Sequence, residues 1–187
     1  MPEPSPLDIS VVIPAYRRPE QLRRAVGSVL AQEPAAPAEI IVVDDASGDA
    51  TADVARELGA TVIVHERNRG EGAARNTGLA AATHDWVALL DSDDEWLPGH
   101  LDVLAPLRDG HVLVGDTCLA TGSGPVAGRL YGWHGDEPRV LRSPASIVWP
   151  ENTITPSAAI LRRATALEAG GFTEGMRHAA DLDLWIR

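Results

Sequence analysis

The sequence predicts an α/β protein with a mostly parallel sheet, because short apolar runs alternate with helical patterns in its first half. The apolar runs have the length of buried strands and lie at 9–13, 40–43, 62–64 and 86–90. Helical patterns follow the first three runs, at 19–30, 47–58 and 73–82. A βαβαβαβ order of this kind implies right-handed crossovers, with helices on the faces of the sheet.

Local signals support the first two helices. Pro14 ends the first apolar run, and Pro19 suits the first position of the following helix. Ser47 is expected to cap the second helix, and Gly59 to end it.

The second half of the chain has a different character. Residues 121–138 are rich in glycine, so a loop or β-ribbon is expected there. A further strand is predicted at 157–161, a short helix at 163–169, and a final helix from about Ala180. The sequence stops about two turns into that helix, and we therefore expect a truncated chain.

Composition limits the function. With 187 residues, 44% of them hydrophobic and 23% charged, the chain should form one globular unit behind a disordered leader at 1–7. Its 16 basic and 27 acidic residues give a net charge of −11, which disfavours a nucleic-acid partner. An anionic ligand would then need a metal ion between itself and the protein carboxylates.

The predicted location is cytoplasmic. Cys118 is the only cysteine, so no internal disulfide can form, as suits a reducing compartment. No apolar run approaches the ~20 residues that span a bilayer. Peripheral association with the inner face of the membrane stays open.

The fourth apolar run leads directly into acidic residues, Asp91-Ser92-Asp93-Asp94. Ligands of open α/β sheets bind beyond the carboxyl ends of the strands, so these acids predict a site for a phosphorylated ligand and its divalent cation. A solvated acidic turn is the alternative. An EF-hand is disfavoured because Trp96 stands where the loop needs glycine.

Two residues after the first and second strands are candidates for nucleobase recognition. Asp45 could accept a hydrogen bond from a base N–H, and the ring of Tyr16 could stack on the base. The alternatives are an acid at a helix N-terminus and a surface aromatic residue. The stretch from Gly70 to Arg75 lacks the third glycine of a dinucleotide fingerprint, so that reading is discounted.

Five sequence pieces, taken together, resemble the family 2 glycosyltransferases. They are residues 11–16 (VVIPAY), 41–49 (IVVDDASGD), 68–70 with 74–78 (NRG and ARNTG), 91–94 (DSDD), and 170–172 with 181–185 (GGF and DLDLW). The resemblance implies the GT-A fold, which is a Rossmann-like, mostly parallel sheet flanked by helices with a smaller acceptor-side region. It also implies inverting transfer of a sugar from a nucleoside diphosphate to a hydroxyl group.

The resemblance further implies roles for individual residues. Pro14 and Ala15 would supply backbone contacts to the donor, and Arg75 would approach its base or diphosphate. Asp93 would ligate Mg²⁺ or Mn²⁺, and Asp91 would approach the ribose or the metal. In the last piece, Asp181 would be the catalytic base, with Asp183 the lesser candidate.

The implied partners are a nucleotide-sugar donor, a UDP-sugar by default, and a carbohydrate, lipid-linked or small-molecule hydroxyl acceptor. Residues 8–118 would bind the nucleotide sugar, and 119–187 would form the acceptor side, with acceptor contacts in 121–138. One alternative is a catalytically inactive binding module, since Ala180 stands where the family usually has an acid. Another is a nucleotidyltransferase, disfavoured because residues 15–19 lack its usual glycine-rich loop.

Overall fold

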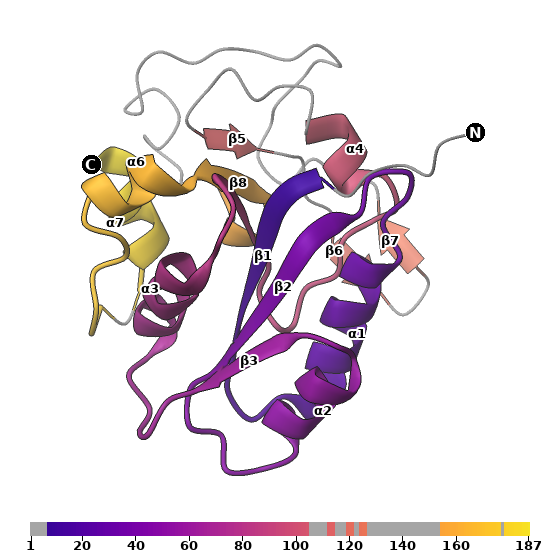
Figure 1. Ribbon diagram of the computed structural model, residues 1–187, viewed down its shortest axis with the longest axis horizontal. Coiled ribbons are helices and arrows are strands. Elements are labelled where there is room, and N and C mark those ends of the chain that lie inside the picture. The colour runs from indigo at the N-terminus through magenta and orange to yellow at the C-terminus, as the bar shows by residue number, and fades with distance from the viewer. Residues whose placement is uncertain (1–6, 105–111, 115–118, 122–123, 127–153, 177) are drawn as a thin grey trace.

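The computed structural model describes residues 7–104, 112–114, 119–121, 124–126, 154–176 and 178–187. Within these residues, one sheet has the strand order β3-β2-β1-β4-β8-β5 (Figure 1). Its strands are β1 (Leu7–Ala15), β2 (Pro37–Asp44), β3 (Thr61–Val64), β4 (Trp86–Leu89), β5 (Val112–Val114) and β8 (Ala159–Arg162).

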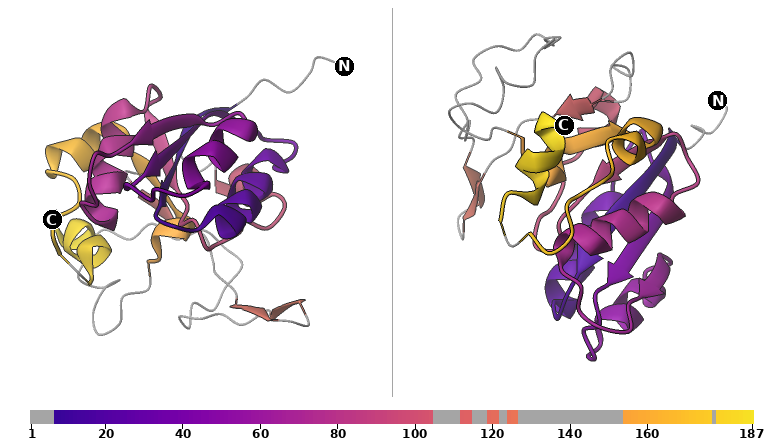
Figure 2. Two further views of the ribbon diagram at one scale, coloured as in Figure 1. Left: turned by 90° about the horizontal axis from the view of Figure 1, so that it is seen from below. Right: turned by 90° about the vertical axis from the view of Figure 1, so that its left-hand side faces the viewer.

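The sheet is mostly parallel, as predicted. Strand β1 pairs in parallel with β2 and β4, and β2 pairs in parallel with β3. Strand β8 lies between β4 and β5 and is antiparallel to both. A separate hairpin of β6 (Leu119–Thr121) and β7 (Gly124–Val126) stands away from this sheet (Figure 2).

Helices cover both faces of the sheet (Figures 1 and 2). On one side lie α1 (Pro19–Leu30) and α2 (Thr51–Glu57); on the other lie α3 (Glu71–Ala81), α6 (Arg163–Glu168) and α7 (Ala180–Ile186). A short helix, α4 (His100–Leu104), and a 3₁₀ turn, η2 (Pro156–Ala158), complete the described elements. None of the described helices is both long and apolar enough to cross a bilayer.

Each face of the sheet packs in its own apolar cluster, because side chains alternate along a strand. Val11 and Ile13 of β1 pack with Val26 of α1, whereas Val12 packs with Leu79 of α3 on the other side. All five side chains are fully buried. Strand β1 therefore anchors the core, and its carboxyl end is held rigidly.

The structure corrects the predicted start of the second helix. Helix α2 begins at Thr51, where the Asp49 carboxylate accepts hydrogen bonds from the Thr51 N–H (2.9 Å) and hydroxyl (2.5 Å). Ser47, the expected cap, instead lies in the preceding loop, where its hydroxyl accepts the Arg17 N–H at 2.8 Å. Pro19 begins α1 as predicted.

Candidate active site

An open pocket of about 380 Å³ lies at the carboxyl ends of the parallel strands. These ends meet at one edge of the sheet because β1, β2, β3 and β4 all run in the same direction. The pocket is lined by Pro14, Ala15, Tyr16, Arg18, Asp45, Asn68, Gly70, Glu71, Ala74, Asp91, Ser92 and Asp93. It occupies the place where open α/β sheets bind ligands.

The loop after β1 presents an aromatic ring and a cation. Tyr16 is 40% exposed, and the Arg17 guanidinium carbon lies 5.1 Å from the centre of its ring. The side chain of Arg18, which lines the pocket, forms an ion pair with Asp93. Both partners of this pair are about half exposed, so it contributes about 0–1 kcal/mol and can open readily.

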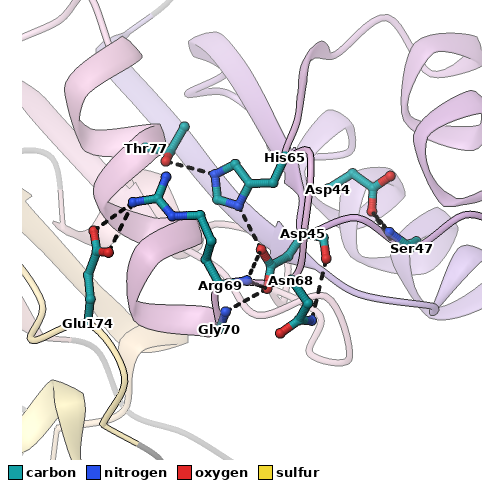
Figure 3. A network of polar contacts seen from close by, with 9 residues as sticks. All are labelled: Asp44, Asp45, Ser47, His65, Asn68, Arg69, Gly70, Thr77 and Glu174. Atoms are coloured by element: carbon teal, nitrogen blue, oxygen red, sulfur yellow. Dashed lines mark hydrogen bonds and ion pairs between the residues drawn. The ribbon is translucent and has the colours of Figure 1, made fainter.

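The loop after β2 presents a buried carboxylate. The side chain of Asp45 is 4% exposed, and its backbone N–H donates to the Ala15 carbonyl at 2.9 Å. Its carboxylate accepts the backbone N–H groups of Arg69 (2.9 Å) and Gly70 (2.8 Å), and contacts Nδ1 of His65 at 2.6 Å (Figure 3). Asp45 thus joins the ends of β1 and β2 to the loop that leads into α3.

The loop after β4 is fixed by a serine from a distant part of the chain. The Ser157 hydroxyl accepts the Asp91 N–H at 3.0 Å and lies 2.5 Å from Oδ2 of Asp94. Burial raises the pKa of Asp94, an effect that the Ser157 hydrogen bond opposes. Asp94 therefore helps to hold the loop, while Asp93 remains exposed beside the pocket.

Arg75 lies beneath the acidic residues rather than in the pocket. Its side chain is 4% exposed, its Nη2 pairs with Asp91 (2.6 Å) and with Glu71, and its guanidinium carbon lies 5.2 Å from the Phe172 ring centre. Its Nε is buried without a hydrogen-bond partner among the described residues. A buried cation in this position holds the two pocket carboxylates in place.

Glu71, at the start of α3, shares the negative field of the site. Burial raises the pKa of Glu71, Arg75 opposes this, and the charges of Asp91, Asp181 and Asp93 raise the pKa further. Asp181 thus adds to the negative field at Glu71, although it is not among the residues that line the pocket.

Helix α7 carries the predicted base, Asp181, and a second acid, Asp183. Asp181 lies in the first turn and is partly buried. Asp183 is bound to its surroundings, since Oδ2 accepts hydrogen bonds from the Thr173 hydroxyl (2.6 Å) and from Arg187 (2.8 Å). The Thr173 hydrogen bond lowers the pKa of Asp183.

An asparagine on α3 holds the turn that precedes α7. The Asn76 side chain donates to the Phe172 carbonyl at 2.8 Å and accepts the Phe172 N–H at 2.7 Å. Gly171 has a φ of +67°, and a Cβ there would lie 2.5 Å from Oδ1 of Asn76. The predicted Gly-Gly-Phe segment therefore needs glycine at 171 for both conformation and space.

Strained backbone occurs in two loops that border the pocket and at the start of α7. Among the described non-glycine residues, Arg17, Ala46 and Ala179 have positive φ angles of 53°, 63° and 58°. They lie in the loops after β1 and β2 and directly before α7. Such residues cluster at ligand sites, where the surrounding structure compensates their conformational cost.

The carboxylates at the pocket suit a divalent cation whose coordination is completed by oxygen atoms of the bound ligand. Among the described residues, no group of three or more His, Cys, Asp or Glu side chains is placed to hold a metal ion. Mg²⁺, however, is commonly held by one or two carboxylates together with substrate phosphates. Asp93 and Asp91 supply such carboxylates at the pocket, so the residues present fit a cation of this kind.

The structure brings together most of the residues predicted for the site. Pro14, Ala15, Tyr16, Asp45, Asp91 and Asp93 line the pocket, whereas Arg75 and Asp181 do not. No role was predicted for Arg18 or Glu71, which also line the pocket. Two features of the sequence could have indicated them. Arg18 stands two residues after Tyr16, and Glu71 directly follows the Asn68-Arg69-Gly70 piece. Most of the predicted acceptor segment, 122–123 and 127–138, lies outside the described residues.

The sheet and the pocket at its carboxyl edge define a protein of the GT-A fold. The structure of TarS from S. aureus (residues 1–349, in complex with UDP-GlcNAc) superimposes with a TM-score of 0.73 and 25% identity, over 95% of this chain and 52% of that 1–349 chain. The mannosyltransferase PcManGT from Pyrobaculum calidifontis, in complex with GDP-Man and Mn²⁺, has a TM-score of 0.62 at 21% identity, over 89% of this chain and 47% of that protein.

The chain belongs to glycosyl transferase family 2, whose model matches residues 10–168. The resemblance drawn from the five sequence pieces is thereby confirmed. The pre-mycofactocin glycosyltransferase of Mycobacterium tuberculosis is 36% identical over 98% of this chain and 39% of its own length. The uncharacterized glycosyltransferase YwdF of Bacillus subtilis is 30% identical over 97% of this chain and 68% of its own length. The chain thus spans well under half of the mycobacterial relative.

Proposed function

We propose that this chain binds a nucleotide-sugar donor and transfers its sugar, with inversion and with the help of a divalent cation, to a hydroxyl acceptor. The main support is one pocket in which three separate loops present different groups. These are an exposed aromatic ring, a buried carboxylate that can accept a hydrogen bond, and two further acids. Tyr16, Asp45 and the Asp91–Asp93 pair supply these groups. Family membership and the UDP-GlcNAc complex of TarS favour a UDP-sugar.

The nucleoside would lie between the loops after β1 and β2. The exposed ring of Tyr16 offers a stacking surface, and the Asp45 carboxylate offers an acceptor for a ring N–H. Pro14 and Ala15 would contact the nucleoside through their backbone. Because uracil, thymine and guanine carry such an N–H, Asp45 favours these bases over adenine and cytosine.

The diphosphate would lie beside Asp91 and Asp93. A divalent cation held by Asp93, with Asp91, would offset charge on the diphosphate as it departs. Asp93 can turn towards a cation cheaply because it gives up only its exposed ion pair with Arg18. The released Arg18 guanidinium is then available to the phosphates, and Arg75 keeps Asp91 in place.

Asp181 would act as the general base. Its carboxylate would take the proton of the acceptor hydroxyl as that oxygen bonds to the anomeric carbon. The bond from this carbon to the diphosphate breaks at the same time, and its electron pair leaves with the diphosphate. Asp183 is the lesser candidate for this role, and its carboxylate accepts hydrogen bonds from Thr173 and Arg187.

Two substitutions test these roles separately. Asp93→Asn is expected to abolish the Mn²⁺-dependent part of donor binding, measured by calorimetry with UDP-sugar. Asp181→Asn should leave donor binding intact but reduce transfer, or hydrolysis of the donor, by about 10²–10⁴-fold. Asp53→Asn is the matched control, because Asp53 pairs with Arg56 on α2 and does not line the pocket.

The outcomes distinguish the alternatives. Equal donor affinity of the wild type and Asp93→Asn throughout a Mn²⁺ titration would refute the metal assignment. Donor binding without any turnover that depends on Asp181 would indicate the binding module. A thermal-shift panel of UDP-, GDP- and TDP-sugars, each with and without Mn²⁺, identifies the base because a bound ligand stabilises the folded state.

The acceptor and the location in the cell complete the proposal. We place acceptor contacts on the side of α7 and residues 119–187, because Asp181 lies there. The acceptor would be a carbohydrate, a lipid-linked compound or a small molecule with a hydroxyl group. A cytoplasmic protein, with or without peripheral contact to the inner membrane face, agrees with this chemistry.

A further inference from the structure

A buried histidine connects the Asp45 carboxylate to the middle of α3. The side chain of His65 is 6% exposed and lies directly after β3. Its Nδ1 is 2.6 Å from Oδ1 of Asp45, and its Nε2 is 2.9 Å from the hydroxyl oxygen of Thr77. Figure 3 shows the imidazole between these two side chains. Neither His65 nor Thr77 lines the pocket.

The hydrogen-bonding roles in this chain of three residues follow from its chemistry. A carboxylate can only accept, so Nδ1 of His65 carries the hydrogen and donates it to Asp45. In a neutral ring Nε2 is then an acceptor, and the Thr77 hydroxyl donates to it. Asp45 therefore fixes the tautomer of the ring, and the Thr77 hydroxyl helps to fix its orientation.

His65 is the donor to Asp45 that is best anchored to the sheet. The other two donors are backbone N–H groups of Arg69 and Gly70, in the loop that leads into α3. By contrast, the His65 backbone N–H donates to the Asp44 carbonyl at 2.9 Å, next to the β2–β3 pairing. The imidazole thus sets the carboxylate relative to the rigid strands.

The geometry also indicates what this orientation serves. A carboxylate offers about four acceptor positions, and three donors approach that of Asp45 from the protein, with the Arg69 N–H shared between Oδ1 (2.9 Å) and Oδ2 (3.1 Å). Because the Arg69 N–H is split between two oxygens, the three donors do not use all four positions, and Asp45 lines the pocket. The direction of the remaining position depends on the His65 ring, which donates a hydrogen bond to Oδ1.

We propose that His65, held by Thr77, is a positioning residue that directs the free acceptor position of Asp45 towards the ring N–H of the donor base. This inference rests on the proposed function, since it assumes that a nucleotide occupies the pocket. It assigns to two residues outside the pocket a part in base recognition.

Thr77 allows a test that spares the core, because removal of His65 itself would leave Asp45 buried and less well paired. Thr77→Val keeps the shape of the side chain but removes the hydroxyl group, and Thr77→Ser is the matched control that keeps it. The probes are the nucleotide that the thermal-shift panel identifies and its derivative methylated at the ring N–H. The ratio of their dissociation constants measures recognition of that N–H.

We expect the wild type and Thr77→Ser to prefer the unmethylated nucleotide to the same degree. In Thr77→Val this preference should fall by about 3- to 10-fold, the value of one hydrogen bond. Thermal unfolding of all three proteins shows whether the fold is retained. A second variant, His65→Asn, places an amide donor near the position of Nδ1 and should keep part of the preference.

The possible failures can be told apart. If Thr77→Val unfolds at a lower temperature but keeps the wild-type preference, the network is only a structural brace and the inference is overturned. The same holds if Thr77→Ser loses as much preference as Thr77→Val. If the wild type binds none of the nucleotides, the proposed function fails and the inference fails with it.

Discussion

At the scale of single residues, burial of one imidazole makes the fold sensitive to acid. His100 stacks on Trp96 with ring centres 4.6 Å apart, and its Nε2 is buried without a hydrogen-bond partner among the described residues. Burial lowers the pKa of His100 to about 4. Neither residue lines the pocket, so this effect concerns stability and not the proposed chemistry.

The consequence is a loss of stability between about pH 6.5 and pH 4. In this range the unfolded chain binds a proton at His100 that the folded protein does not, so the free energy of unfolding falls as the pH falls. The loss amounts to at most about 3 kcal/mol, and it is absent above the unfolded pKa. Urea unfolding at a series of pH values, for the wild type and for His100→Phe, measures it.

The phenylalanine variant keeps a ring against Trp96 but cannot titrate. Its unfolding free energy should therefore fall less steeply with acid than that of the wild type. Carboxylates such as Asp94 contribute equally to both proteins and cancel in the difference. Parallel curves for the two proteins would contradict the assignment.

Site residues could be predicted from the sequence only where they come directly after a predicted strand. Asp91, Asp93, Asp45 and Tyr16 could be predicted as pocket residues because each comes just after a predicted strand. The burial of Arg75 could not, because its partners are set by how α3 packs beside the β4 loop. Similarly, the contact of His65 with Asp45 joins residues 20 positions apart through the β2–β3 pairing.

At the scale of elements, α3 lies unusually close to β1. A Cβ on Gly78 would be 2.2 Å from Cγ1 of Val12, a distance at which the helix or the strand must move. Val12 is fully buried beneath the helix. Gly78 therefore sets the separation between α3 and the sheet, and with it the position of the α3 start beside the pocket.

Gly78→Ala should destabilise the protein by about 1–3 kcal/mol, the usual effect of overpacking a core. Gly27→Ala in α1 is the matched control, because nothing lies within 4 Å of the added Cβ. There the better helix propensity of alanine should stabilise by about 0.5–1 kcal/mol. Chemical unfolding should give a lower free energy of unfolding for Gly78→Ala and a higher one for Gly27→Ala. Equal changes in the two variants would refute the close approach of α3 to β1.

The turn before α7 gives a second prediction at this scale. Asn76→Ala removes both hydrogen bonds to Phe172 and leaves two backbone groups without these partners. We expect a loss of about 2–3 kcal/mol of stability. Donor affinity should stay unchanged, since Asn76 does not line the pocket, while turnover should fall because the turn supports the helix of Asp181.

Thermal unfolding, donor calorimetry and turnover of Asn76→Ala are the measurements. Asn76→Asp keeps an acceptor for the Phe172 N–H but loses the donor to its carbonyl, so an intermediate stability is expected. Wild-type stability of Asn76→Ala would show that the two hydrogen bonds are replaced by solvent without cost.

Elements could be predicted from the sequence where their signals are local. The apolar runs and Pro19 identify β1, β2, β4 and α1, because burial and helix initiation leave a pattern in a few adjacent residues. The start of α2 was wrong because Ser47 suits a cap by its sequence, whereas in the structure it accepts the Arg17 N–H and the helix begins after Ala50, with the Thr51 N–H donating to Asp49. The antiparallel placement of β8 between β4 and β5 depends on pairing between distant residues, which no local pattern records.

At the scale of the whole molecule, the protection of backbone amides against hydrogen exchange should decrease from β1 outward. Strand β1 is hydrogen-bonded on both sides by β2 and β4, and apolar clusters cover both of its faces. By contrast, residues 173–176 are exposed. Stability against local opening follows burial and backbone pairing, so these regions should differ strongly.

Hydrogen–deuterium exchange followed by mass spectrometry tests this order. Peptides covering β1 and β4 should exchange last, and peptides from 173–176 first. Bound nucleotide should add protection to the loops after β1, β2 and β4, because these line the pocket. Equal protection of β1 and of 173–176 would contradict the described arrangement.

The late position of β8 in the chain has a consequence for biosynthesis. Strands β1 to β4 have left the ribosome before β8 is made, so the outer edge of β4 waits for residues 159–162. At ~5–20 residues per second, the delay is on the order of several seconds. During that time a nascent polypeptide displays an unpaired apolar strand, Trp86–Leu89, which is where a chaperone would protect it from aggregation.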